Sequence, residues 1–351
     1  MKIGIEASRL TESQRTGTEN YLYNLVRKFS EIDKKNKYIL YFRETPSEKL
    51  WGELSGGNSN FSYRVPKRIF SWTQVGLALE LFRETPDVLF CTWHTMPGIN
   101  PFWKMKTISS MHDAFGRFIP SFWTAHFSHK LICVSAKSKR DVARRFMKDD
   151  DNISVIHEGR GVSLVPASED EIKRVKDKYG IEGDYIFFLS TLGPRKNLEN
   201  ITQAYEGLHE NLSFVASGKI MAGSEHLTEL PMTYIGRSED EDLSGLITGA
   251  KFLVFASKDE GFGLPMLEAM DCGTPVLASD IEVLREIAGE AAVFVDPDSV
   301  EDIRRGMGEL LTDEALCKDL VRKGFENVKR FSWENSAQQL LTVFEEVTSE
   351  E

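Results

Sequence analysis

The sequence contains few cysteines, and none has the spacing of a metal or disulfide site. Zinc sites need cysteine or histidine ligands grouped a few residues apart, and small secreted domains need a dense set of cysteines. The 351 residues contain only four cysteines, scattered at Cys91, Cys133, Cys272 and Cys317. We therefore expect reduced core thiols, no metal site and a cytoplasmic protein.

Long apolar stretches are also missing. No run of apolar residues approaches the roughly 20 that a membrane-spanning helix needs. The opening residues 1–7 are typical of a strand and lack the apolar core of a signal peptide. We therefore expect neither an integral membrane protein nor a secreted one.

Two further signatures are absent. The full G-x-G-x-x-G fingerprint of dinucleotide-binding proteins does not follow the first strand, which argues against an NAD enzyme. We also find no helix-turn-helix, zinc or RNA-binding signature, so a nucleic-acid partner is not expected.

The charge is unevenly distributed. Residues 1–162 contain 25 Lys and Arg against 17 Asp and Glu, whereas the rest contains 18 against 37. Any single basic cluster is best interpreted as a solvated surface, but their sum favours an anionic partner for the first half, such as a membrane face or a phosphorylated acceptor. The basic clusters are Lys34/Lys35/Lys37, Arg64/Lys67/Arg68, Lys137/Lys139/Arg140 and Arg144/Arg145/Lys148.

Short apolar strands alternate with amphipathic helices along the whole chain, which is typical of parallel sheets covered by helices on both faces. The pattern occurs twice, so we expect an α/β protein of two Rossmann-like domains. The expected strands are 2–7, 38–42, 88–91, 107–110, 131–135 and 153–156 in the first half, and 185–189, 213–216, 232–235, 252–255, 275–278 and 292–295 in the second.

The domain boundary is expected where a loop containing Pro166 and a short charged helix separate the two sets of strands. This gives a first domain of residues 1–162, a linker of 163–183 and a second domain of 184–331. The helix predicted for 332–351 has no following strand to cover. We expect it to cross back and pack on the first domain.

The most informative segment runs from Glu260 to Glu268 with the sequence EGFGLPMLE. A buried strand leads into it, and Pro265 suits the first turn of a helix. Carboxylates on both sides of a glycine-rich turn, together with the N–H groups at a helix start, can bind a ligand rich in hydroxyl groups.

The segment from Gly193 to Asn197, with the sequence GPRKN, places two cations before a predicted helix that Asn197 would cap. The helix dipole, the first N–H groups, Arg195 and Lys196 can converge on a phosphate. A solvated surface turn is the other interpretation. The position directly after a strand favours the phosphate site, because open α/β sheets bind ligands at that edge.

The first domain offers two weaker candidates. Gly17, in the sequence RTGTE, opens a helix and can approach a phosphate through its backbone, although an ordinary helix start is as good an interpretation. His112 follows a strand at its carboxyl end, where it can hydrogen-bond a sugar or simply cap a loop.

These residues together resemble the retaining GT-B-fold glycosyltransferases of family 4, most closely bacterial mannosyltransferase-like members that build surface polysaccharides. The most specific part is the pair Glu260 and Glu268 in its context, continuing through the sequence AMDCGTPV at 269–276. Weaker matches are the sequences PRKN at 194–197, YIG at 234–236, MHD at 111–113, IHEG at 156–159 and FSW at 331–333.

The resemblance implies two domains facing across a cleft, with the donor on the second and the acceptor on the first. It implies transfer of a hexose from a nucleotide-diphosphate sugar, with retained configuration and with neither metal nor other cofactor. GDP-mannose is the expected donor, and a glycan or lipid-linked molecule is the expected acceptor, with peripheral contact at the inner membrane face.

The resemblance also implies roles for particular residues. Arg195 and Lys196 would hold the diphosphate, Glu260 would hold the donor sugar and His112 would contact it. Glu268 would bind the ribose, and Gly17 would approach the phosphate. The remaining expected contacts come from Ile235, Gly236, Gly261, Phe262, Gly263 and Leu264.

Three features differ from the family pattern. Ser190 stands where Gly is common, the segment between His112 and Ser135 is shorter than expected, and the segment after Gly159 lacks the usual hydrophobic-Asp ending. Leu192 stands where some members carry a basic residue, which leaves Arg195 and Lys196 as the only cations of their turn. The segment 115–127 is dense in aromatic residues, which either belong to the core, line the acceptor site or touch lipid. Two rival functions remain open: a nucleotide-sugar epimerase on the same fold, and a non-catalytic nucleotide-sugar-binding partner.

Overall fold

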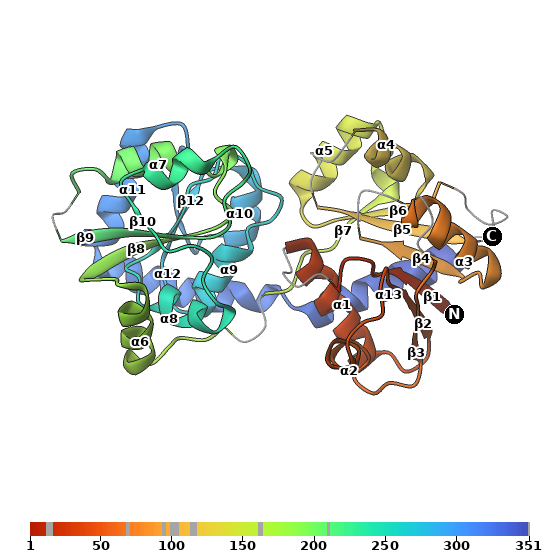
Figure 1. Ribbon diagram of the computed structural model, residues 1–351. Helices are drawn as coiled ribbons and strands as arrows, with labels where there is room; N and C mark the ends of the chain where they lie inside the picture. The colour runs from red at the N-terminus through yellow and green to blue at the C-terminus, as the bar shows by residue number, and fades with distance from the viewer. Residues whose placement is uncertain are drawn as a thin grey trace. The chain divides into compact units, whose positions relative to one another are not determined.

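The chain is divided into two units, each built around its own sheet (Figure 1). The computed structural model describes residues 1–11, 17–67, 71–92, 96–98, 105–112, 118–160, 164–208 and 211–349. Unit 1 consists of Met1–Gly159 and Ser332–Glu351, and unit 2 consists of Arg160–Phe331.

The described part of unit 1 contains a sheet of seven parallel strands in the order β3-β2-β1-β4-β5-β6-β7. The order reverses between β1 and β4, which pair with each other. In sheets of this kind, ligands bind at the carboxyl ends of the strands beside such a reversal. The strands are β1 Lys2–Glu6, β2 Lys37–Tyr41, β3 Phe61–Arg64, β4 Val88–Cys91, β5 Lys106–Met111, β6 Lys130–Cys133 and β7 Ile153–Val155.

The helices of unit 1 pack against its sheet, and each buries one apolar face. On α1, for example, Leu22, Leu25 and Phe29 recur at helical spacing and are buried. The helical segments are α1 Gly17–Ile32, α2 Glu48–Ser55, η1 Trp72–Leu77, α3 Ala78–Arg83, α4 Phe118–Phe127, α5 Ala136–Phe146, η3 Asp150–Asn152 and α13 Trp333–Ser349.

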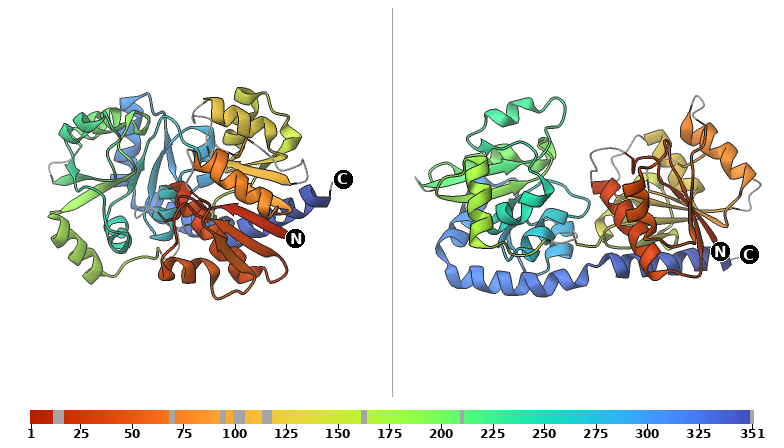
Figure 2. Two further views of the ribbon diagram at one scale, coloured as in Figure 1. Left: turned by 45° about the vertical axis from the view of Figure 1, so that its right-hand side comes forward. Right: turned by 60° about the horizontal axis from the view of Figure 1, so that its bottom comes forward.

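The last helix, α13, packs in unit 1 as the sequence predicted. It lies against α1 and β5 (Figure 2). The ring of Phe344 sits 6.0 Å from that of Phe29 and 5.7 Å from that of Phe90, measured between centroids. Burial of this apolar face fixes the end of the chain on the first unit.

The described part of unit 2 contains six parallel strands in the order β10-β9-β8-β11-β12-β13, with the reversal between β8 and β11. The loops that leave β8 and β11 carry the segments 193–197 and 260–268, so the topology brings the two strongest sequence motifs to one edge. The strands are β8 Asp184–Leu189, β9 Leu212–Ser217, β10 Thr233–Tyr234, β11 Leu253–Phe255, β12 Val276–Ser279 and β13 Val293–Val295.

Helices lie on both faces of this sheet, with α7 and α11 on one side and α6 and α8 on the other (Figure 1). The helical segments are α6 Glu169–Tyr179, η4 Pro194–Lys196, α7 Leu198–Tyr205, η5 Glu225–Glu229, η6 Asp240–Asp242, α8 Leu243–Thr248, α9 Leu264–Asp271, α10 Glu282–Ala288, α11 Val300–Thr312, α12 Glu314–Asn327 and η7 Val328–Arg330.

Every strand predicted from the sequence is present within two residues at either end. The sequence missed β3, a short edge strand that pairs only with β2 among the described residues. The helix α6 lies inside the expected linker 163–183, yet it packs on α8 and belongs to unit 2.

Candidate active site

The turn after β8 is fixed by Asn197, although not in the predicted way. Its backbone is left-handed, with φ of 61°, and its side chain makes no cap bond to α7. Instead, Nδ2 donates to the carbonyl of Ala256 at 3.0 Å and to that of Pro297 at 2.7 Å. Asn197 therefore links three loops. It occupies the predicted N-cap position of α7, but its side chain does not make the capping hydrogen bond.

The loop after β11 is hydrogen-bonded to the turn after β8, because the N–H of Lys258 donates to the carbonyl of Arg195 at 2.9 Å. The two predicted motifs meet here. Lys196 Nζ lies 2.5 Å from Glu260 Oε1, and the two side chains are only 16% and 11% exposed. The ammonium also lies 5.5 Å from the ring centroid of Phe255.

Arg195 is more exposed than Lys196 and approaches a different carboxylate. Its Nη1 lies 3.8 Å from Asp259 Oδ2. The sequence analysis did not single out Asp259, although its position beside Glu260 was the available signal. Both cations of the turn thus stand beside the carboxylates of the loop after β11.

Gly263 makes the sharp turn into α9. Its φ is 114°, a conformation that residues with a side chain rarely adopt. A Cβ placed there would lie 3.0 Å from Met266 Cε and 3.1 Å from Leu284 Cδ2. The backbone conformation and the close side chains both favour glycine at this turn, which connects Glu260 to the start of α9.

The N-terminal end of α9 follows directly, with Leu264 as its first residue and Pro265 as its second. The first N–H groups of an α-helix lack partners within the helix and carry partial positive charge. Phe262, by contrast, is buried, and its ring packs edge-on against Phe331 at 5.8 Å. Its side chain is a packing group, and any ligand contact at this position falls to the backbone.

Glu268 lies on the second turn of α9, in surroundings that disfavour charge. Burial raises the pKa of its carboxyl to about 7, and the negative charges of Asp240 and Asp271 add to the effect. No described residue forms an ion pair or a side-chain hydrogen bond with this carboxylate. A ligand that donates hydroxyl hydrogens would supply the missing partners.

The ends of β9 and β10 complete this edge of unit 2. Ile235 N–H donates to the carbonyl of Ala216 at 3.0 Å, and Gly236 accepts from the N–H of Gly218 at 3.0 Å. Gly218 has φ of 152°, and a Cβ there would lie 1.7 Å from the carbonyl oxygen of Ser190. Sequence reasoning missed Gly218, which lets the loops after β8 and β9 touch.

In unit 1, Gly17 opens α1 as predicted. Among the described residues, apart from its chain neighbours and its own helix backbone, no atom lies within 4 Å of the position that its Cβ would occupy. Packing against the described residues therefore does not require glycine there. Arg15 and Thr16, which begin the predicted motif, lie outside the described residues.

His112 follows β5, and its Nδ1 lies 3.0 Å from Glu158 Oε1. Its Nε2 is buried and has no hydrogen-bond partner among the described residues. The ring of Tyr21 packs edge-on against the imidazole, with the centroids 4.6 Å apart. Asp113, the next residue of the predicted motif, lies outside the described residues.

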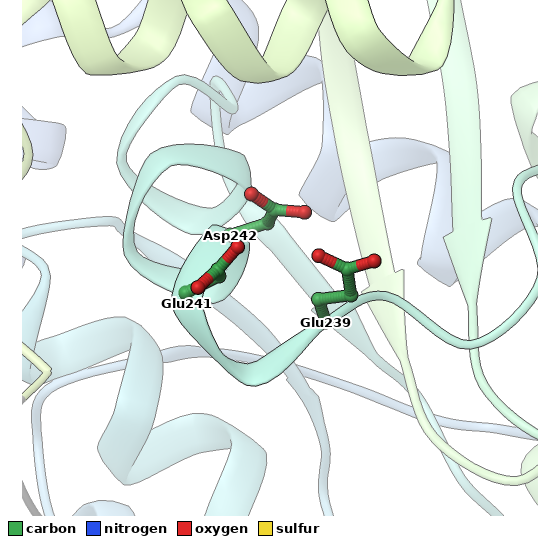
Figure 3. Close-up of side chains that lie close together, drawn as sticks. All are labelled: Glu239, Glu241 and Asp242. Atoms are coloured by element: carbon green, nitrogen blue, oxygen red, sulfur yellow. The ribbon is translucent and has the colours of Figure 1, made fainter.

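One acidic cluster has the spacing of a metal site. Ligand atoms of Glu239, Glu241 and Asp242 lie within 4.8 Å of one another on the turn that leads into α8 (Figure 3). Asp242, however, already accepts hydrogen bonds from Arg174 and Lys178 of α6, each at 2.6 Å. Burial alone would raise the pKa of Asp242, but these donors and Tyr179 lower it to about 2. The cluster joins α6 to α8.

Two neighbouring helices of unit 1 expose apolar and basic side chains, the residue types that an anionic membrane surface would contact. On α4, Ile119, Trp123 and Phe127 recur every four residues and are 80%, 40% and 46% exposed. The neighbouring helix α5 ends in the exposed pair Arg144 and Arg145. None of the described helices has the length and hydropathy that crossing a membrane requires.

Comparison with known proteins finds a family match within unit 2. The family "Glycosyl transferases group 1" matches residues 169–327, which include both motifs. The serotype-specific mannosyltransferase WbdA of Escherichia coli is 35% identical over 193 residues, which are 51% of this chain and 24% of WbdA. The O-antigen chain mannosyltransferase B of Escherichia coli is 31% identical over 61% of this chain and 60% of its own length.

The chain thus spans less than two thirds of these relatives. Among solved structures, Anabaena HepE in complex with UDP-glucose superposes with a TM-score of 0.80 at 16% identity, covering 99% of this chain and 100% of HepE. Residues 169–327 are therefore a glycosyl transferases group 1 domain, in a chain that has the two-sheet GT-B fold.

Proposed function

We propose that this protein is a retaining, metal-independent hexosyltransferase that uses a nucleotide-diphosphate sugar, with GDP-mannose as the donor. The observation that carries the proposal is the Lys196–Glu260 pair, 2.5 Å apart beside the start of α9. The names of the two Escherichia coli relatives support mannose as the sugar. A glycan or lipid-linked acceptor of surface polysaccharide synthesis fits the same names.

The chemistry explains why these groups belong together. As the nucleoside diphosphate leaves, negative charge develops on its phosphate oxygens and positive charge on the sugar carbon. Lys196, Arg195 and the start of α9 would stabilise the phosphate, and the oxygens of Glu260 would hold sugar hydroxyls. In this proposal, these cations and the helix N-terminus stabilise the negative charge on the phosphate, which a metal ion stabilises in other enzymes.

The remaining residues position the donor. Glu268 would accept hydrogen bonds from the ribose hydroxyls, because its carboxylate faces no donor among the described residues. Ile235 and Gly236 would border the nucleotide base at the end of β10. Backbone groups of Gly261, Phe262, Gly263 and Leu264 would contact the sugar, and Gly17 and His112 would act on the same donor from unit 1.

Lys196→Ala tests the proposal. We expect turnover of GDP-mannose to fall by a factor of roughly 100 or more, because the variant loses a cation that stabilises the leaving group. Lys258→Ala is the matched control, since Lys258 lies in the adjoining loop and its Nζ pairs with exposed Asp298 at 3.1 Å. The assay follows GDP release, first as slow hydrolysis and then with candidate acceptors.

Three results would count against the proposal. Normal turnover by Lys196→Ala would remove the cation from the mechanism. Epimer formation from UDP-N-acetylglucosamine without acceptor would identify an epimerase. Tight donor binding with no hydrolysis and no transfer would identify a non-catalytic binding partner.

We also propose that unit 1 meets an anionic membrane surface peripherally. Exposed aromatic and aliphatic side chains on α4 can enter the lipid headgroup region, and the arginines at the end of α5 can attract anionic lipids. Such a surface would give the enzyme access to a lipid-linked acceptor.

A further inference from the structure

The contact between His112 and Glu158 joins two segments that are far apart in the sequence. His112 follows β5 and Glu158 follows β7, and β6 lies between these strands, with Met111 level with Cys133 and Cys133 level with Val155. The three parallel strands end at the same edge, so the two side chains meet there. Their atoms Nδ1 and Oε1 are 3.0 Å apart.

Backbone hydrogen bonds anchor the chain at His112 and next to Glu158. The carbonyl of His112 accepts a hydrogen bond from Ser138 Oγ at 2.9 Å. On the other side, the carbonyl of His157 accepts from Ser336 Oγ at 2.7 Å. A Cβ on Gly159 would lie 2.4 Å from Trp333, so glycine allows the chain after Glu158 to pack directly on the start of α13.

Burial makes this contact energetically important. The side chain of Glu158 is 6% exposed and that of His112 is 16% exposed. A carboxylate so shielded from water is costly unless a donor faces it. The only side-chain donor that reaches it among the described residues is the imidazole of His112.

The contact also determines which imidazole nitrogen carries the proton. An ionised carboxylate only accepts hydrogen bonds, so Nδ1 must be the protonated nitrogen. In the neutral ring, Nε2 then presents a lone pair. This atom is buried, and it has no partner among the described residues.

Two more buried hydroxyl groups lie close by. The hydroxyl of Ser110 is on the same side of β5 as His112, because side chains alternate along a strand. The hydroxyl of Tyr21 belongs to the ring that packs against the imidazole. The Tyr21 and Ser110 hydroxyls are near enough to each other to interact, which leaves Nε2 of His112 as the buried atom that a polar group of a ligand would satisfy.

We propose that Glu158 is a positioning residue: it holds His112 in the tautomer with a protonated Nδ1, so that Nε2 accepts a hydrogen bond from a hydroxyl of the transferred sugar. This inference rests on the proposed function for the identity of the ligand. The tautomer itself follows from the geometry of unit 1 alone.

The direct test is nitrogen NMR of the full-length protein labelled with ¹⁵N-histidine. His112→Asn assigns the signals of His112 among those of the seven histidines. We expect a protonated Nδ1 and a bare Nε2 in the wild type. Glu158→Gln keeps the shape but removes the charge, and it should give a mixture of both tautomers. A protonated Nε2 with a bare Nδ1 in the wild type would overturn the inference.

Enzyme kinetics test whether the Glu158–His112 contact affects turnover of the donor sugar. We expect Glu158→Gln to lower kcat for GDP-mannose hydrolysis at least about ten-fold while KM changes less, as for other residues that orient a histidine. The double variant with His112→Ala should be no slower than His112→Ala alone, because Glu158 acts only through the ring. Additive losses, or an unchanged kcat in Glu158→Gln, would refute the role.

Asp33→Asn is the control for removing a buried carboxylate from unit 1. Asp33 accepts hydrogen bonds from Asn36 and Tyr38 beyond the end of α1, so its loss should reduce stability without changing kcat. The proposed function fails separately: if no nucleotide sugar is bound or hydrolysed while the NMR spectrum shows the expected tautomer, then the assigned ligand is wrong and the positioning contact is supported.

Discussion

The ionised form of Glu268 should cost this protein stability. Its pKa of about 7 in the folded protein stands above the ordinary value of 4.5, because the carboxyl is buried and faces Asp240 and Asp271. The folded state therefore holds this proton more tightly than the unfolded state does. The contribution of Glu268 to the free energy of unfolding therefore becomes less favourable as the pH rises from about 4.5 to about 7. Above that range, its full destabilising effect is present.

Glu268→Gln removes this cost while keeping the shape of the side chain. A pKa difference of about 2.5 corresponds to about 3 kcal/mol at pH 8 and to less than about 1 kcal/mol at pH 5. For a domain of this size, we expect the melting temperature at pH 8 to rise by roughly 5–10 °C, with a much smaller gain at pH 5. Differential scanning calorimetry at the two pH values measures both changes.

The same variant should bind the donor more weakly. Charge-assisted hydrogen bonds contribute about 1.5–3 kcal/mol each, so we expect the Kd for GDP-mannose to rise by roughly ten-fold or more. Glu182→Gln is the matched control, because it removes the same charge from an exposed position of unit 2. It should change neither quantity.

Two results would refute this reasoning. A lower stability of Glu268→Gln at pH 8, or an equal gain at pH 5 and pH 8, would show that the carboxylate is not destabilised by its surroundings. An unchanged Kd would remove Glu268 from the donor site, even if the stability gain is observed.

Three other predictions follow from the same geometry. GDP-mannose should bind more tightly as the pH rises through about 7 and should release up to one proton near that pH, since the ribose contact needs ionised Glu268; calorimetry in buffers of different ionisation enthalpy measures this, and pH-independent binding would contradict it. Gly263→Ala should cost roughly 1–3 kcal/mol of unfolding free energy because of its φ of 114°, whereas Gly52→Ala, inside α2 with open space around it, should be neutral or stabilising. Vesicles containing anionic lipid should retain the protein at low salt and release it at high salt; Arg144→Glu with Arg145→Glu should weaken retention, and retention that ignores both salt and these charges would refute the membrane surface.

The sequence predicted the fold well because the strands of both sheets are buried and apolar. In β8 and β11, the apolar runs are bounded by turns that carry the motifs, so the strand positions and the loop positions support each other. The edge strand β3 has the sequence FSYR, which is too short and too polar to show such a pattern. Its partner β2 supplies the tertiary context that the local sequence does not.

The residues of the proposed donor site could be predicted from the sequence only individually, without their contacts. The sequence indicated Lys196 and Glu260 separately, and the reversal between β8 and β11 brings them together. Asn197 is a residue type that often caps helices, so the sequence predicted a capping bond. Its side chain instead donates to the carbonyls of two loops that are distant in the sequence. The contact of Glu158 with His112 spans 46 positions and depends on the register of β5, β6 and β7, which no local pattern encodes.

The central claim is that Lys196 and Arg195 hold the diphosphate of the donor. A crystal structure with GDP-mannose measures this directly. We expect Lys196 Nζ about 3 Å from a phosphate oxygen, with the sugar hydroxyls on Glu260. A diphosphate bound elsewhere, with Lys196 still paired to Glu260 and no phosphate near Arg195, would contradict the account.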